Sequence, residues 1–454
     1  MAQKSKITSR PMTKALGTAS ILSMAIAGAN MANAIQTDFG VTYQADAFYV
    51  DGDAYGDDGS GNGLANLLRL KADFKDENTG VSLHTSIQLA GSTFSGDDRG
   101  MTANDINGQP VTFTGGSYNN NGNETVTLDT GYVQIPIAGN LLRVGRQAAN
   151  WNNCLLVCDD RRDRVSFLAP TSIGTWIALY DRRADNISGN GVFESADSGD
   201  MFSGGLITRL GGMNVGLLYV HFFKNSEAAT YSFQNVNIFS PYISGSITEG
   251  LEFATGLNYV WGNDNGGGNS PFGDGTLAGL DVEDGWSGYA RLTGDVGMLD
   301  WGVQYLGTFD GGLVDPGFDT YSSILNNNPA STQSPTSLVS MGRALGIQEY
   351  DEHLVIGQLG FNVTPKLKLT GAVGWFSADN GQLDVDDTSM IYDVSASYQI
   401  NDAVSTVASL GVMTENEAML GISGNGNTLA GVGTPSNFAD EDLMAANVGL
   451  RVKF

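Results

Sequence analysis

The chain ends in MAANVGLRVKF, residues 444–454, and every even-numbered position in this stretch is apolar. The odd-numbered positions include Asn447, Arg451 and Lys453. Successive side chains of a β-strand point to opposite faces, so the spacing predicts a strand with one apolar and one mostly polar face. Such a strand fits either a soluble sandwich, between core and solvent, or a membrane barrel, between lipid and lumen.

The same alternation fills most of the chain. Residues 39–49, 81–89 and 299–309 repeat it, and the spacing of an amphipathic helix is hard to find. We therefore predict an all-β chain of about 18 strands, or 16 if the weakest pair, 161–169 and 175–184, does not form. The predicted strands lie near 36–50, 63–76, 80–93, 124–136, 140–148, 161–169, 175–184, 202–210, 215–224, 232–246, 251–262, 286–294, 299–310, 350–363, 367–377, 388–400, 404–413 and 441–454.

The connections between these segments alternate between short and long. Short ones such as 77–80 and 138–140 contrast with long ones such as 94–123 and 311–349, which are rich in turn-forming residues. Outer-membrane barrels have short periplasmic turns and long outer loops, whereas a soluble sandwich has no reason to separate loop lengths by side. Loops of this length are also unusual in a compact soluble domain. The pattern predicts a transmembrane antiparallel β-barrel.

The N-terminus has the anatomy of a secretory signal peptide. Lys4, Lys6, Arg10 and Lys14 precede or open an apolar run that reaches Ala29, and no acidic residue occurs before Asp38. Ala32-Asn33-Ala34 then provides a small-residue cleavage site. We expect residues 1–34 to be removed and residues 35–454 to form one barrel domain. No later stretch is long and apolar enough for a transmembrane helix.

Composition narrows the function classes. The chain has 23 Lys and Arg against 49 Asp and Glu, a net charge of −26, which disfavours nucleic-acid binding. The three histidines, His84, His221 and His353, lie far apart without a catalytic or metal-binding signature beside them. We therefore expect no cofactor, no metal site and no enzyme, although separation along a sequence does not by itself forbid a site.

The signal peptide, the alternating strands and the terminal Phe454 together resemble the Gram-negative outer-membrane porins. The run Val448-x-Leu450-x-Val452-x-Phe454 is similar to the C-terminal signal that the barrel-assembly machinery reads in that family. The resemblance implies a homotrimer of 16- or 18-stranded barrels in the outer membrane, in contact with lipid and lipopolysaccharide. It also implies an inward constriction loop after the fifth strand, here residues 147–160. The Pro-Glu-Phe-type motif of enteric porins is missing, so no residue role is carried over from them.

Arginine is concentrated between residues 143 and 183 of this acidic chain. Apolar neighbours such as Val165 and Phe167 read as lipid-facing, which directs Arg162 and Arg164 into the lumen. Opposed charges across a narrow pore set ion selectivity, although the same residues could instead form salt bridges that only hold the loop. We predict a constriction in which an arginine strip faces carboxylates on the inward loop, formed by Arg143, Arg162, Arg164, Arg183, Arg209, Arg291, Asp159 and Asp160.

Cys154 and Cys158 lie in the same predicted loop. In an oxidising periplasm a disulfide is favoured over a reduced pair or a metal site. The predicted function is passive diffusion of ions and small hydrophilic solutes. The alternatives are a channel selective for small carboxylates or sugars and, less favoured, a structural or enzymatic barrel. The preference for cations or anions stays open, because the acidic loops and the arginine strip favour opposite signs.

Overall fold

The structure is a computed structural model. It describes residues 35–51, 60–93, 102–104, 110–112, 127–182, 200–223, 236–262, 284–315, 317–326, 341, 349–381, 384–418 and 442–454. The predicted signal peptide lies outside these ranges. Within them, no helix has the length and apolar character needed to cross a membrane.

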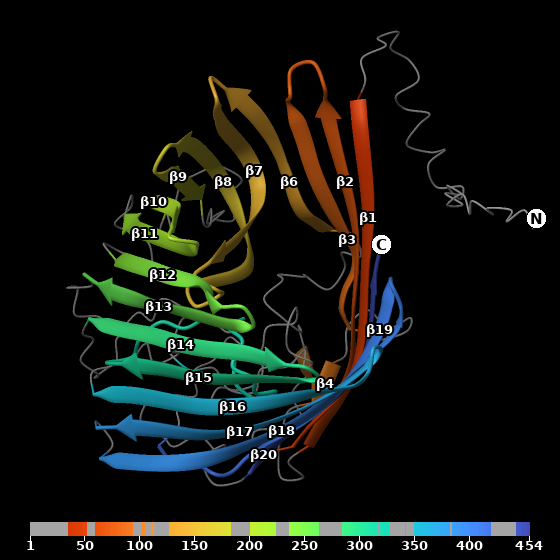
Figure 1. Cartoon of the computed structure of the whole chain (residues 1–454), viewed down its shortest axis with the longest axis vertical. Helices are drawn as coiled ribbons and strands as arrows, with labels where there is room; N and C mark the ends of the chain where they lie inside the picture. Colours follow the sequence, from red (N-terminus) through yellow and green to blue (C-terminus); the bar gives the residue numbers. More distant parts are fainter. Residues whose placement is uncertain are drawn as a thin grey trace, which may run out of the picture.

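Eighteen strands form one antiparallel sheet that closes on itself (Figure 1). Each strand pairs with the next along the chain, and β1 also pairs with β20 from Thr42↔Lys453 to Asp51↔Met444. A separate hairpin is made by β4 (Thr102–Asn104) and β5 (Pro110–Thr112). The barrel strands are β1 (Ile35–Asp51), β2 (Ser60–Asp76), β3 (Ser82–Thr93), β6 (Thr127–Ile137), β7 (Asn140–Trp151), β8 (Val157–Thr171), β9 (Gly174–Arg182), β10 (Asp200–Leu210), β11 (Met213–Phe223), β12 (Asn237–Thr248), β13 (Leu251–Trp261), β14 (Gly285–Val296), β15 (Leu299–Phe309), β16 (Tyr350–Thr364), β17 (Leu367–Asn380), β18 (Val385–Asn401), β19 (Val404–Met413) and β20 (Leu443–Lys453).

The prediction of 18 strands is confirmed, and the alternative of 16 is wrong. The two weakest segments form β8 and β9, which pair from Thr171↔Gly174 to Asp163↔Arg182. β8 begins at Val157 instead of residue 161, because it continues beyond the barrel wall as one arm of a hairpin. The alternation of side chains was sufficient to find every strand of the barrel.

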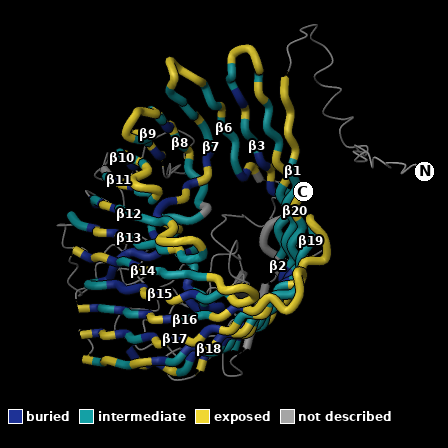
Figure 2. The backbone as a smooth tube through the Cα atoms, viewed as in Figure 1, coloured by how far each residue is buried: buried dark blue, intermediate teal, exposed yellow. Residues whose placement is uncertain are grey.

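The outer surface is apolar, as a barrel in lipid requires. Exposed and buried residues alternate along the strands (Figure 2). One cross-strand row over β11–β15 consists entirely of aromatic residues, and its last two rings stack with centroids 4.0 Å apart. Water-soluble proteins rarely expose so large an apolar surface, whereas aromatic girdles mark the interfaces of membrane barrels. The row contains Tyr219, Phe239, Tyr259, Trp286 and Phe309.

Part of the barrel interior holds an apolar core. Inward side chains of β15–β18, including Leu306, Ile356 and Phe376, are fully buried, and Phe318 and Ile324 from the β15–β16 connection pack against them. The long connection 311–349 was predicted as an outer loop. Residues 311–315, 317–326 and 341 of this connection are instead folded into the barrel, because their apolar side chains pack against apolar residues of the inner wall.

Candidate pore constriction

The β7–β8 hairpin leaves the barrel wall and bends inward. β7 pairs with β6 only as far as Arg146, and β8 pairs with β9 only as far as Asp163. Beyond these points, within the described part of the chain, the two strands pair only with each other, up to Trp151↔Val157. Gly145, at the departure point, has φ +128°, and an added Cβ would lie 2.3 Å from the carbonyl oxygen of Gly131. Glycine is required there because other residues strain at this φ.

Residues 147–160 were predicted as a loop, and that part of the prediction is wrong. They are the end of β7, a tip at residues 152–156 and the start of β8. Continued strand pairing satisfies the backbone N–H and C=O groups that a loop inside a barrel would leave without partners. The predicted inward position is correct, and the hairpin supplies it.

The tip reaches the inner wall formed by β12 and β13. The indole Nε1 of Trp151 donates to the carbonyl oxygen of Ser240 at 2.9 Å, and Asn152 Nδ2 donates to Ser240 Oγ at 3.0 Å. Asn258 Nδ2 in turn donates to the carbonyl oxygen of Leu155 at 3.1 Å. Ser240 and Asn258 are fully buried. Their neighbours Phe239 and Tyr259 are exposed on the lipid side, so alternation points Ser240 and Asn258 inward. The hairpin therefore extends through the lumen to strands that lie four to six positions further round the barrel.

A disulfide between Cys154 and Cys158 closes the tip. Between them Leu155 is completely buried in the apolar core with Val314 and Phe318. Asn152, Asn153 and Cys154 all have φ near +60°, a conformation that Asn tolerates better than most residues. The tip is thus a compact turn held by a covalent bond, by packing and by hydrogen bonds.

The β15–β16 connection is a second inward segment, which the sequence did not reveal. Its Leu313 carbonyl oxygen accepts hydrogen bonds from Asn258 Nδ2 at 3.0 Å and from Ser287 Oγ. Asp315 N donates to the carbonyl oxygen of Leu155 at 2.9 Å, which joins this segment to the hairpin tip. Further along, Ser323 N donates to the inward carboxylate of Asp393 at 2.8 Å. The sequence feature that could have indicated this inward position is the apolar content of a segment that was expected to be a surface loop.

Arg162 and Arg164 face inward, as their alternation with Val165 predicted. Arg164 makes a bidentate salt bridge with Asp181, with Nε–Oδ1 at 2.5 Å and Nη2–Oδ2 at 2.6 Å, and the Asp181 side chain is fully buried. Arg162 Nη2 lies 2.5 Å from Asp160 Oδ2, and this carboxylate is 45% exposed. Arg164 therefore has a structural role in the barrel wall, whereas the Arg162–Asp160 pair is in contact with solvent.

The predicted opposition of charges across the lumen is wrong. Asp160 is two residues from Arg162 on the same strand, because residues that were expected in a facing loop belong to the same hairpin. Asp159 is part of β8, but its side chain is outside the described set, and Arg183 is outside the described residues altogether.

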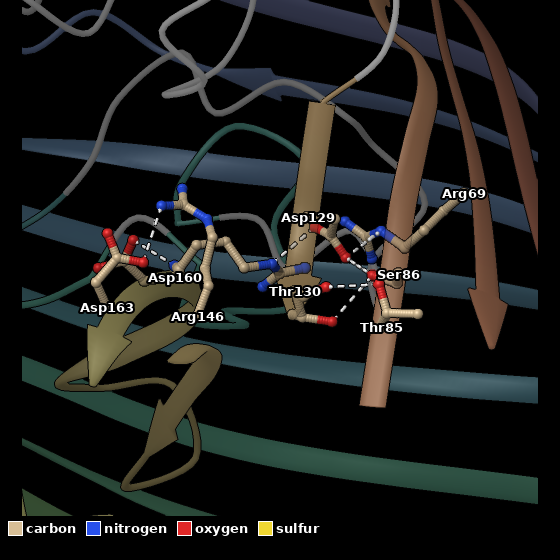
Figure 3. A network of polar contacts seen from close by, with 9 residues as sticks. Arg69, Thr85, Ser86, Asp129, Thr130, Arg146, Asp160 and Asp163 are labelled. Carbon is tan, nitrogen blue, oxygen red and sulfur yellow. Dashed lines mark hydrogen bonds and ion pairs between the residues drawn. The ribbon is translucent and has the colours of Figure 1, made fainter. Parts of the chain in front are cut away.

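A carboxylate hub that was not predicted joins the hairpin to the wall (Figure 3). Asp129 of β6 is 2.7 Å from Arg161 Nε and 2.9 Å from Arg69 Nε, and it accepts a hydrogen bond from Ser86 Oγ. Arg146 and Asp163 form a looser pair at 3.5 Å where the hairpin departs. The β3–β6 register shifts at Asp129, so simple alternation misassigns its face.

The remaining predicted arginines are spread around the barrel. Arg143 Nε donates to Gln134 Oε1 at 2.8 Å, and its guanidinium lies 5.9 Å from the centre of the Tyr132 ring. Arg291 donates to the backbone of the second inward segment and lies over the Tyr321 ring at 4.9 Å. Arg209 is exposed beside the turn after β10, where it bonds Asn214 Oδ1 at 3.0 Å, so it is not part of the constriction.

Asp315 is the titratable group at the junction of the two inward segments. Burial raises the pKa of its carboxyl to about 7, against the lowering effect of backbone hydrogen bonds from Gly317 and Cys158. Asp160 raises the pKa further and Arg162 lowers it. The charge at this junction therefore changes near neutral pH. Among the described residues, no cluster of three or more His, Cys, Asp or Glu could hold a metal ion.

Comparisons with known proteins identify the fold. No family model matches the chain, and no curated protein sequence matches it. OccK9 (OpdG) of Pseudomonas aeruginosa is 12% identical, with a TM-score of 0.57, and the match covers 92% of this chain and 98% of that one. OpdO of the same organism (12% identity, TM-score 0.55) and OccAB3 of Acinetobacter baumannii (12%, 0.55) each match over 92% of this chain, and over 97% and 100% of their own lengths.

At this level of identity the likeness concerns the fold. The chain has the architecture of a Gram-negative outer-membrane β-barrel of the porin type, with 18 strands. The predicted fold class is confirmed on that basis.

Proposed function

We propose that the protein is a channel for the passive diffusion of ions and small hydrophilic solutes across the outer membrane. The observation that carries the proposal is the β7–β8 hairpin, which extends through the lumen and ends on Ser240 of β12 and Asn258 of β13. A barrel of this size is too wide for its own side chains to fill, and an inward hairpin narrows it without closing it. The hairpin also places the solvent-contacting Arg162–Asp160 pair in the narrowed part of the lumen, which we call the neck.

Selectivity is proposed to arise from the charges on and beside this hairpin. Arg143 and Arg162 place guanidinium groups on the inward face, while Asp160 and Asp315 place carboxyl groups near the tip. A narrow passage with low-dielectric walls strengthens the field of such charges compared with open water. These guanidinium groups favour the second candidate function, a channel that prefers small carboxylates, because guanidinium matches carboxylate geometry.

The proposal is tested by planar-bilayer recording of the refolded protein under a KCl gradient. We expect discrete conductance steps, and we expect Arg162→Gln to shift the reversal potential toward cation preference because it removes a positive charge from the neck. Arg164 is a poor target for this purpose, since its removal would leave buried Asp181 unpaired.

Arg209→Gln is the matched control. Its guanidinium is also inward but lies at the turn after β10, so its loss should leave the reversal potential close to wild type. Equal shifts in both variants would remove the selectivity role from the hairpin. A refolded barrel that never conducts would contradict the channel itself. If added acetate or citrate reduces the KCl current of wild type, and reduces it less in Arg162→Gln, the result would favour the carboxylate-selective candidate.

The expected partners extend the proposal. Phe454 is 70% exposed on the outer surface and closes the barrel by exchanging backbone hydrogen bonds with Val41, at 2.7 and 3.1 Å. We propose that the barrel-assembly machinery recognises this terminal strand, that cleavage after Ala34 releases the mature chain, and that the barrel assembles as a trimer among lipid and lipopolysaccharide.

A further inference from the structure

A serine, a histidine and an aspartate form a hydrogen-bonded chain on the lumen side of β2 and β3. Ser82 Oγ is 2.8 Å from His84 Nε2, and His84 Nδ1 is 2.8 Å from Asp73 Oδ1. Both distances fit a single tautomer, in which Nδ1–H donates to the carboxylate and Nε2 accepts from the hydroxyl. A nucleophile within hydrogen-bond reach of a base that a third group orients is the arrangement of serine hydrolases.

The array faces the water-filled side of the wall. Ser82 and His84 are two residues apart on β3 and share a face, while Leu83 between them is 43% exposed on the lipid side. The side chains of His84 and Asp73 are 28% and 40% exposed. The imidazole is also held by the Tyr132 ring, which stacks on it at 4.8 Å and 19°. The base is therefore oriented on two sides and remains open to solutes.

Polar and cationic groups surround Ser82 where charge would develop. The strand register places Lys75 directly opposite Ser82 on β2 and Gln134 directly opposite it on β6. Arg143 follows in the same row on β7 and is bonded to Gln134. Directly opposed residues have Cβ atoms about 5 Å apart, so the Lys75 ammonium can approach an oxyanion formed at Ser82.

We propose that Ser82, His84 and Asp73 form a hydrolytic site for small carboxylic esters on the lumen wall. Ser82 Oγ attacks the ester carbonyl carbon as its proton moves to His84 Nε2, and Lys75 stabilises the oxyanion. The C–O bond to the leaving group breaks as His84 returns the proton to it, which leaves an acyl-Ser82. Water then attacks this acyl group and gives its proton to His84, the bond to Ser82 Oγ breaks, and the hydroxyl regains the proton. The net reaction is ester plus water to acid plus alcohol.

The roles differ among the three residues. Ser82 and His84 are catalytic, because they exchange bonds or protons with the substrate. Asp73 is a positioning residue, because it acts through the His84 tautomer. The burial of Ser82, which is 5% exposed, restricts the site to small acyl groups. The site is independent of the pore selectivity proposed above, since none of its three residues lies on the inward hairpin.

The test uses the refolded full barrel in detergent, with a fluorophosphonate probe and 4-nitrophenyl acetate as substrate. We expect the probe to label Ser82, as located by peptide mass spectrometry, and Ser82→Ala and His84→Gln each to lower kcat/KM at least 100-fold. Asp73→Asn should lower kcat with little change in KM, and Asp73→Glu should recover part of the loss. A merely structural role for Asp73 would not produce that split or that recovery.

Ser203→Ala and His221→Gln are the matched controls. Ser203 is fully buried on β10, and His221 Nδ1 lies 2.9 Å from Asn237 Oδ1. Both controls should label and turn over as wild type does. Wild-type barrel that conducts normally but neither labels nor hydrolyses the ester overturns the proposal, and so does hydrolysis that is unchanged in Ser82→Ala. Because labelling is measured on wild type, misfolding of a variant cannot obscure the result.

Discussion

Asn258→Ala should loosen the constriction without disturbing the barrel wall. The Asn258 side chain is fully buried and makes three hydrogen bonds that connect β13 to both inward segments and to β12. It donates to the carbonyl oxygens of Leu155 at 3.1 Å and Leu313 at 3.0 Å, and it accepts from Ser240 Oγ at 2.7 Å. No other described side chain contacts both inward segments and the wall in this way.

The free-energy cost of Asn258→Ala depends on which hydrogen bonds its three partners keep. Leu155 O still accepts from Asp315 N, Leu313 O still accepts from Ser287 Oγ, and Ser240 Oγ still accepts from Asn152. The variant therefore loses three ordinary hydrogen bonds, each with a net value of about 1 kcal/mol, without leaving a buried group wholly unsatisfied. The bond from Ser240 lies within the wall, so only the two bonds to Leu155 and Leu313 hold the inward segments. Their loss, about 2 kcal/mol, lowers the ratio of anchored to released inward segments by about 30-fold.

Single-channel recording measures this ratio. The remaining bonds from Trp151 and Asn152 keep the tip anchored for most of the time, so we expect a similar mean conductance with larger open-channel noise and brief high-conductance steps. Asn362→Ala is the control, because Asn362 is exposed and makes a single long bond of 3.4 Å to Met298 O. Traces of Asn258→Ala that match wild type in both noise and step size would refute the claim that the tip is held by this wall.

Three further predictions concern stability and charge. Arg164→Ala should lower the free energy of urea unfolding by about 3–5 kcal/mol, because buried Asp181 loses its cation, and Arg164→Met with Asp181→Leu should recover most of this loss. Asp315 keeps its proton up to about pH 7 in the folded state but releases it near its ordinary value of 3.8 when unfolded, so the unfolding free energy should fall as pH rises between these values and become less pH-dependent in Asp315→Asn. Cys154→Ser with Cys158→Ser should cost about 2 kcal/mol at the tip, since the closed loop is short, and should increase channel noise as reduction of wild type does.

The strands were predictable because a membrane barrel enforces strict alternation. Lipid excludes charged side chains on one face of every strand, so that face remains readable even in β9, which is only nine residues long. The inner face carries no such rule. On β16, Leu354 and Ile356 point inward and Val355 points outward, so the local sequence is apolar on both faces. That continuous apolar run indicates a strand with an apolar inner face, but the sequence does not show which residues pack against that face.

The candidate site was predictable only in part, because it depends on departures from regular strand geometry. Arg162 and Arg164 obey the alternation of β8 and were found by it. Asp129 lies at a register shift, so alternation does not give its side. Arg161 bonds to Asp129 from the part of β8 that has left the wall, a contact that alternation along one strand does not indicate. The inward bend itself depends on Gly145, and a single glycine among 61 carries no recognisable signal.

The distribution of side chains inside the barrel determines where water can pass. On the β15–β18 side, Phe318 and Ile324 lie against Leu306 and Phe376, all fully buried, and apolar space of this kind stays dry. On the opposite side, the inward residues of β2, β3 and β6–β8 include charged and polar side chains that are in part exposed, such as Asp73, His84 and Asp160. In the proposed channel, the conducting path therefore follows that second wall. The Arg162–Asp160 pair and the Ser82–His84–Asp73 array both lie on this half, so the proposed selectivity and the proposed ester hydrolysis share one side of the lumen.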